Sequence, residues 1–233
     1  MTTPGTIAER WRAVRAEVDA ACVAAGRRPD EVTIVAVSKL HPASAVDEVA
    51  AAGALDVGEN YAQELVAKRA GASPASASLR WHFIGRLQRN KARLVAGQVA
   101  LVHAVDSLDL AVELGKRAAA AGTIQPILAA VNVGGEEQKT GVSPDAARAL
   151  VDALRNVAGV RLDGLMTMPP PTDDPEAVRL AFRALRQLRD ALATPTSPLP
   201  HLSMGMSSDF AVAIAEGATL VRIGTAIFGE RVA

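Results

Sequence analysis

Eight short apolar runs alternate with Ala-rich segments of helical spacing along almost the whole 233-residue chain. The apolar runs predict β-strands at residues 32–38, 54–58, 81–85, 101–105, 126–133, 162–168, 201–206 and 220–223. The segments between them predict helices at residues 43–52, 61–69, 89–95, 108–121, 144–157, 175–193 and 209–216. Regular alternation of strands and helices is typical of α/β proteins with a parallel sheet.

Eight such repeats predict an α/β protein with a single (β/α)8 TIM barrel, spanning 1–233 as one domain. An extra helix is expected at 7–25, before the first strand, and no long helix follows the eighth. The extra helix is therefore expected to fill the gap in the outer ring. The alternative is an open doubly wound sheet, which usually carries a Gly-rich turn after its first strand. Here the first strand runs into SKLHP, without glycine, so the barrel is favoured.

The charge composition narrows the possible functions. The chain carries 25 Lys plus Arg and 25 Asp plus Glu, so nothing attracts nucleic acid or an acidic membrane to it in general. No apolar run could cross a bilayer, the N-terminal segment lacks the apolar core of a signal peptide, and the single Cys22 cannot form an internal disulfide. We therefore expect a cytoplasmic protein without nucleic-acid or membrane partners and, with no apolar stripe left over, a monomer.

The carboxyl ends of barrel strands are where chemistry gathers. The first predicted strand ends at Lys39 and the second at Asn60, and the sixth ends in a Met-Thr-Met run that closes with Met168. The few polar groups at these ends predict one pocket for a small ligand.

The last two strand ends have the composition of an anion site. The segment SMGMSS, which includes Ser203, Met204 and Ser207, offers hydroxyls and backbone N–H groups before a predicted helix. Gly224 and Thr225 offer the same after the eighth strand, where barrels commonly bind phosphate. Alternatively, the serines only cap a helix and the glycine only turns the chain. Two such clusters on neighbouring strands, together with an arginine, favour phosphate.

Lys39 has a possible role opposite that corner. Loss of solvation at a dry strand end would lower the pKa of the lysine and increase the fraction of free amine. A free amine attacks a carbonyl and forms a Schiff base. A carbonyl and a phosphate across one barrel mouth suggest either a phosphorylated sugar or pyridoxal 5′-phosphate.

Seven segments, in register from about residue 34 to 231, carry a family resemblance: AVSKLHP, GENYAQE, WHFIGRLQRNK, DSLDLA, GLMTMPP, LSMGMSSD and VRIGTAIFGER. Together they resemble the YggS/PROSC family of pyridoxal phosphate homeostasis proteins. The resemblance implies a barrel like the N-terminal domain of alanine racemase, a fold-type III pyridoxal phosphate protein. It also implies a protein that buffers pyridoxal phosphate or delivers it to apo pyridoxal phosphate-dependent enzymes.

The resemblance also implies roles for individual residues. Lys39 would form the Schiff base, and Arg222 would face the pyridine nitrogen. Asn60 and Met168 would line the ring. The phosphate would be held by four residues, with Met204 counted among the cofactor contacts: Ser203, Ser207, Gly224 and Thr225.

Several other residues have simpler interpretations. His82, His103 and Cys22 are expected in the core, and His201 is expected to bond nearby backbone. His41 could reach the mouth or remain in a surface loop. A second amine, Lys139, follows the fifth strand and could contact a ligand. Solvated surface positions are expected for six arginines: Arg27, Arg28, Arg179, Arg183, Arg186 and Arg189.

Cofactor binding alone does not make the chain an enzyme. An arginine beside the pyridine nitrogen keeps that nitrogen unprotonated and weakens the ring as an electron sink, although alanine racemase has one too. Racemases of this fold also supply a tyrosine base from a C-terminal β-domain, and here we expect no such domain; the one tyrosine is Tyr61. Three hypotheses remain: a non-catalytic binder, a weak racemase or lyase acting on amino acids, and a Schiff-base aldolase. The family resemblance favours the first.

Overall fold

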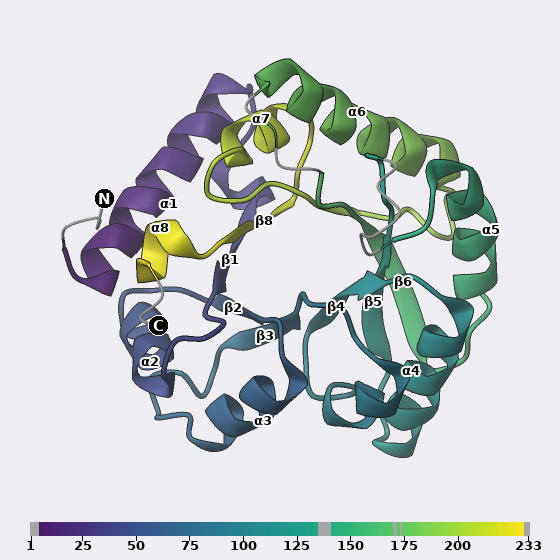
Figure 1. Cartoon of the computed structure of the whole chain (residues 1–233), viewed down its shortest axis with the longest axis horizontal. Helices are drawn as coiled ribbons and strands as arrows, with labels where there is room; N and C mark the ends of the chain where they lie inside the picture. The colour runs from purple at the N-terminus through teal and green to yellow at the C-terminus, as the bar shows by residue number, and fades with distance from the viewer. Residues whose placement is uncertain (1–4, 135–140, 170–171, 173, 231–233) are drawn as a thin grey trace.

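Eight parallel strands close into a barrel in chain order, surrounded by a ring of helices (Figure 1). The computed structural model describes residues 5–134, 141–169, 172 and 174–230. The strands are β1 (Thr33–Val37), β2 (Asp56–Glu59), β3 (Arg80–Phe83), β4 (Leu101–Val105), β5 (Gln125–Ala130), β6 (Val160–Met166), β7 (His201–Ser203) and β8 (Leu220–Ile223). Strand β1 pairs with both β2 and β8, which closes the barrel, and the open doubly wound alternative is excluded.

The helices follow the predicted alternation. They are α1 (Ile7–Ala24), α2 (Ala43–Ala51), α3 (Ala62–Ala70), α4 (Leu108–Ala120), α5 (Pro144–Leu154), α6 (Pro175–Leu192), α7 (Phe210–Ala215) and α8 (Thr225–Phe228), with 3-10 helices η1 (Pro29–Glu31) and η2 (Arg89–Leu94). The segment expected as a helix at 89–95 is therefore a 3-10 helix. Within the described part of the chain, no helix has the length and apolar character of a membrane span.

The extra helix α1 occupies the place that the short helices near the end of the chain leave open. It packs against α7, α8 and α2 in the outer ring (Figure 1). Its buried residues, Trp11, Val14, Val18 and Cys22, recur at helical spacing and form one apolar stripe. The prediction that this helix completes the ring is confirmed, and so is the interpretation of Cys22 as a small core hydrophobe.

Strand alternation separates two kinds of interior. Residues such as Val57, Val102 and Val221 belong to the large apolar core. A smaller apolar cluster contains Val35, Leu101, Ala104, Leu128, Met166 and Leu220, and an irregularity in the pairing of β4 with β5 between Val102 and Val105 lets β4 contribute both Leu101 and Ala104. Because successive strand residues point to opposite faces, the large core lies between the sheet and the helices, and the small cluster lies inside the barrel.

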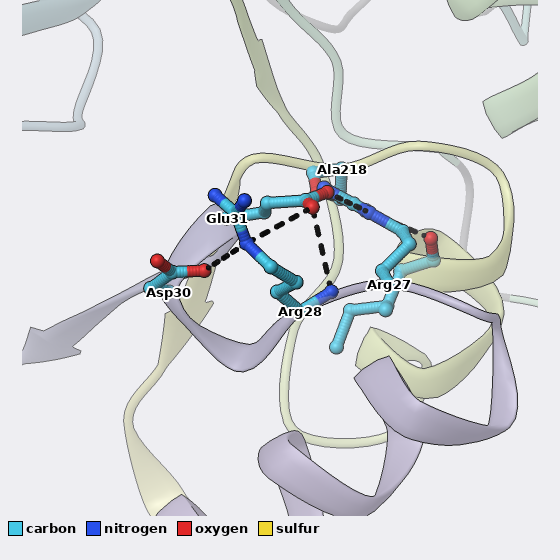
Figure 2. A network of polar contacts seen from close by, with 6 residues as sticks. Arg27, Arg28, Asp30, Glu31 and Ala218 are labelled. Carbon is cyan, nitrogen blue, oxygen red and sulfur yellow. Dashed lines mark hydrogen bonds and ion pairs between the residues drawn. The ribbon is translucent and has the colours of Figure 1, made fainter.

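The connection between α1 and β1 is tied to the far end of the chain. Arg27 donates to the backbone oxygens of Ile214, at 3.0 Å, and Ala218, at 2.7 Å. Figure 2 shows its side chain reaching toward Ala218 while Arg28 turns toward Asp30 and Glu31. The Arg27 side chain is 17% exposed and that of Arg28 is 76% exposed. The expected solvated role is therefore correct for Arg28 and wrong for Arg27.

The arginines of α6 also differ from expectation. Arg179, Arg183 and Arg186 reach the carboxylate of Glu216, at 3.2, 3.0 and 3.3 Å. Glu216 is 4% exposed, and its pKa is lowered because Arg183 donates a hydrogen bond to it. Three of the four arginines on this helix therefore hold the end of α7 against α6, because a buried carboxylate requires charged partners.

We predict that Arg27→Met lowers the free energy of unfolding by about 1–3 kcal/mol, because a buried carbonyl loses a charged donor. The matched control is Arg28→Met, which should change it by less than about 0.5 kcal/mol since that side chain is exposed. Urea unfolding of both variants measures the difference. Equal effects would contradict the role assigned to Arg27.

Candidate functional site

A cavity of about 550 Å³ opens at the carboxyl ends of the strands. Seven of the nine predicted cofactor residues line it: Lys39, Asn60, Met168, Ser207, Arg222, Gly224 and Thr225. They come from the ends of β1, β2, β6, β7 and β8, which are separated along the chain but adjacent in the barrel. The cavity combines one amine, one buried guanidinium and several hydroxyls within a wall that is otherwise largely apolar.

Some lining residues were not among the predicted cofactor residues. Ser208 adds another hydroxyl beside Ser207, and Arg86 adds a cation from the end of β3. Ile84, Gly85, Ala104, Met166 and Met206 supply the apolar and backbone surface. A side chain at Gly85 would collide with the backbone of Asn60, so the glycine permits the two strand ends to approach closely. Gly85 and Arg86 follow the third predicted strand, so their strand-end position is the sequence signal that marks them.

The backbone on both sides of Lys39 is held by side chains. Ser38 donates from Oγ to Glu59 Oε1 at 2.6 Å, and its carbonyl accepts from Lys68 Nζ at 2.8 Å. Leu40, at φ 63°, donates its N–H to Glu64 Oε2 at 2.9 Å. A left-handed conformation is unfavourable for leucine, so the surrounding bonds must hold it there. Lys39 therefore leaves β1 from a fixed, strained turn.

A buried ion pair supports this turn. Lys68 Nζ lies 2.6 Å from Glu59 Oε1 and 3.2 Å from Glu64 Oε2, and Glu59 is fully buried. Burial raises the pKa of Glu59, and the hydrogen bonds from Lys68 and Ser38 only partly oppose this. Glu59 Oε2 has no hydrogen-bond partner among the described atoms. Sequence reasoning missed the pair, although Glu59 precedes Asn60 directly and Lys68 lies one helix further on.

Arg222 is a buried cation at the floor of the cavity. Its Nη1 donates to Ser203 Oγ at 2.6 Å, and its Nη2 donates to the carbonyl oxygen of Thr167 at 3.0 Å. Burial lowers the pKa of Arg222 to about 10, partly offset by Asp209, so the guanidinium remains charged at neutral pH. Both partners are uncharged oxygens, and the described residues form no ion pair with it within 4.0 Å. The positive charge is therefore left to act on the cavity.

Ser203 and Met204 do not line the cavity. Ser203 is fully buried, and its hydroxyl is already shared between Arg222 and His103. Met204 packs in the large apolar core. In this geometry the Ser203 hydroxyl bonds Arg222 on β8 and His103 on β4 rather than facing the cavity, so its contact with a phosphate remains a prediction that the cavity lining does not support. Ser207, four residues later, does reach the cavity.

The hydroxyl side of the cavity lies where β7 and β8 end. Ser207, Ser208 and Thr225 lie at the wall, two of them in the connection that leads to α7. That connection is fixed by Asp209, whose side chain accepts from the N–H of Met206. It includes Gly205, at φ +94°, where a side chain would also press on Ala213.

The histidines behave partly as expected. His82 and His103 are buried in the barrel, as predicted, but they also contact each other, with 2.9 Å between Nδ1 of His82 and Nε2 of His103. His41 stacks on Phe228, and His201 lies 3.4 Å from the Thr219 hydroxyl rather than on backbone. No cluster suited to a metal occurs among the described residues, and Lys139 lies outside them.

Comparisons with known proteins agree with this architecture. The family model of the alanine racemase N-terminal domain matches residues 10–232. A pyridoxal phosphate homeostasis protein from Aquifex aeolicus is 45% identical over 96% of this chain and 97% of its own. Another from Pseudomonas aeruginosa is 46% identical over 97% and 96%.

The chain belongs to the pyridoxal phosphate homeostasis proteins of the alanine racemase N-terminal domain family. Among solved structures, PipY of Synechococcus elongatus with PLP bound matches with a TM-score of 0.82 and 35% identity, covering 96% of this chain and all of that one. Alanine racemase from Clostridium difficile matches with a TM-score of 0.68 at 17% identity, over 86% of this chain and 53% of that chain. The second likeness is one of fold alone.

We predict that Lys68→Met lowers the free energy of unfolding by about 3–5 kcal/mol, because it leaves Glu59 as an unpaired buried carboxylate. Lys116→Met, at an exposed position, should cost less than about 0.5 kcal/mol. Adding Glu59→Leu to Lys68→Met should restore much of the loss, since no buried charge then remains. Denaturant unfolding measures all three, and a mild effect of Lys68→Met would contradict the buried pair.

We also predict that stability falls as the pH drops below about 6.5, the ordinary pKa of histidine. Burial holds the pKa of His103 well below that value in the folded chain, and His82 and Arg222 lower it further. Below that pH the unfolded chain therefore binds a proton that the folded chain does not bind. The free energy of unfolding falls by up to about 1.4 kcal/mol per pH unit as a result.

His201, whose pKa burial also lowers, acts in the same direction. The measurement is urea unfolding between pH 8 and pH 5.5. His103→Leu should give a flatter dependence on pH than the parent chain, whatever its own stability. An equal slope would show that His103 does not contribute.

Proposed function

We propose that the chain binds pyridoxal 5′-phosphate as a Schiff base on Lys39 and serves pyridoxal phosphate homeostasis, by buffering the cofactor or delivering it to apoenzymes. The observation that carries this is a single cavity that holds Lys39, Arg222 and the hydroxyls of Ser207 and Thr225. Relatives more than 40% identical over nearly the full length are named pyridoxal phosphate homeostasis proteins, which supports the same role.

The residues fit the chemistry of this group. A cavity of about 550 Å³ is within the range of small-molecule sites. The aldehyde would meet the amine of Lys39, the pyridine nitrogen would accept from Arg222, and the phosphate would meet Ser207, Ser208, Gly224 and Thr225. Asn60 and Met168 would border the ring. An amine, a buried cation and a hydroxyl corner are the three features that the cofactor requires.

The same residues favour storage over catalysis. When bound, pyridoxal phosphate supplies an aldehyde for amines and a ring that can accept electrons. Arg222 remains charged and would donate to the ring nitrogen, which therefore stays unprotonated and withdraws electrons poorly. We infer that the chain holds and releases the group and turns over no substrate. The second candidate is a weak racemase or lyase, which the likeness of fold to alanine racemase leaves open.

The test begins with titration of the apo chain by pyridoxal phosphate. We expect a yellow complex, with borohydride fixing one label on Lys39, and no fixed label in Lys39→Ala. Labelling of Lys91 or Lys139 instead would overturn the assignment of the amine. Exchange of the α-proton of amino acids in deuterated water would favour the weak enzyme over the carrier.

Thr225→Ala examines the phosphate corner in the same titration. Loss of one hydrogen bond to a charged group, about 1.5 kcal/mol, weakens binding of pyridoxal phosphate about tenfold. Pyridoxal, which has no phosphate, serves as the control ligand and should bind the variant as it binds the parent. An equal loss for both ligands would mean that Thr225 does not meet the phosphate.

A further inference from the structure

Five polar side chains, called the polar network below, form a continuous series of hydrogen bonds across the inside of the barrel. Asp56 Oδ1 lies 2.8 Å from His82 Nε2, and His82 Nδ1 lies 2.9 Å from His103 Nε2. His103 Nδ1 lies 2.8 Å from Ser203 Oγ, which accepts from Arg222 Nη1 at 2.6 Å. All five residues are at least 94% buried.

The polar network runs between the two ends of the barrel. Asp56 is the first residue of β2, where Arg80 on the surface pairs with it at 2.6 Å, and His82 is the third residue of β3. Arg222 stands near the end of β8 and lines the cofactor cavity. The neighbours of these residues along the strands, such as Val57, Val102 and Val221, belong to the large apolar core outside the sheet. Because strand side chains alternate between the two faces, the residues of the polar network point into the barrel.

The donor and the acceptor of each hydrogen bond follow from the residues at the two ends of the polar network, Arg222 and Asp56. A guanidinium can only donate, so Ser203 Oγ accepts from Arg222 and gives its own proton to His103 Nδ1. His103 then carries its proton on Nε2 and donates to His82 Nδ1. His82 in turn carries its proton on Nε2 and donates to Asp56.

The opposite direction would leave groups without partners. If His103 donated to Ser203, the serine proton would have no described acceptor. If His82 accepted from Asp56, that carboxyl would have to be protonated. Burial favours protonation, but the hydrogen bonds from His82 and Arg80 outweigh it and lower the pKa of Asp56. Both histidines are therefore neutral, with their protons on Nε2.

We propose that Ser203, His103 and His82 are positioning residues that aim the charge of Arg222 at the ring nitrogen of the bound cofactor. This rests on the proposed function for what Arg222 meets. Ser203 and the Thr167 carbonyl fix Nη1 and Nη2 from the barrel side, so the rest of the guanidinium faces the cavity. Hydrogen bonds that all run one way, from a cation to a carboxylate, polarise and strengthen one another.

The neutral links have a specific effect. A carboxylate in direct contact with Arg222 would cancel much of its charge. Here Asp209 acts on Arg222 without forming an ion pair with it, and Asp56, already paired with Arg80, stands three side chains away, so the polar network stabilises the cation without neutralising it locally. A purely structural network would have no reason to affect how the site distinguishes a ring nitrogen from a carbon.

The first experiment needs no cofactor. Nitrogen-15 NMR of histidine-labelled apo protein should show Nδ1 unprotonated and Nε2 protonated for both His82 and His103, assigned with His82→Gln and His103→Gln. A proton on Nδ1 of either histidine would overturn the proposed direction. This result is independent of whether the chain binds pyridoxal phosphate at all.

The second experiment compares pyridoxal phosphate with 1-deazapyridoxal phosphate, in which a C–H group replaces the ring nitrogen. The parent chain should prefer the natural cofactor. Ser203→Ala and His103→Leu should reduce that preference roughly threefold to tenfold, the value of one hydrogen bond of about 0.5–1.5 kcal/mol. Ser203→Thr, which keeps the hydroxyl, should retain it, and Thr225→Ala should weaken both ligands by the same factor.

The outcomes separate the two proposals. If circular dichroism shows that Ser203→Ala and His103→Leu are folded and both keep the preference for pyridoxal phosphate over its 1-deaza analogue, the polar network has only a structural role and the inference is overturned. If neither variant folds, loss of the preference in Ser203→Thr overturns it. If the parent chain binds neither ligand, the proposed function fails, and the aiming of Arg222 at a ring nitrogen fails with it; the NMR result still decides the direction of the hydrogen bonds.

Discussion

A buried positive charge without a carboxylate beside it organises the inside of this barrel. Arg222 is 6% exposed, and its described hydrogen-bond acceptors are a hydroxyl and a carbonyl. Moving a cation out of water is costly, so polar groups must surround it. The interior accordingly holds a line of polar side chains where a barrel of this size would normally be filled by apolar ones. The apolar residues of the lumen are correspondingly few.

The barrel and the strand ends could be predicted because their signals are local. Strand-length apolar runs and capped helices such as α5 and α6 depend on residues close together in sequence. Position at a strand end was enough to bring Lys39, Asn60 and Arg222 to one mouth, because parallel strands all end on the same side. Family motifs then assigned chemistry to these positions.

The polar partnerships could not be predicted because they depend on which strand faces which across the barrel. The hydroxyl of Ser203 and its position at a strand end predict a phosphate ligand, yet in the structure Ser203 links β4 to β8 by its hydrogen bonds to His103 and Arg222. Glu216 and the arginines of α6 lie more than 25 residues apart, and periodicity alone marks those arginines as surface. Sequence identifies a residue type and its element, whereas a hydrogen bond requires the register of both partners.

The two sides of the cavity are supported by separate networks. The turn at Lys39 is held by hydrogen bonds among Ser38, Leu40, Glu59, Glu64 and Lys68. Arg222 is held by Thr167 and by the polar network that begins at Ser203 and ends at Asp56. No described residue belongs to both. Changes in networks without shared partners usually act independently. In the proposed complex, covalent capture at Lys39 and the electronic state of the ring would then be altered separately, and release of the cofactor would not disturb the cation proposed to face its ring nitrogen.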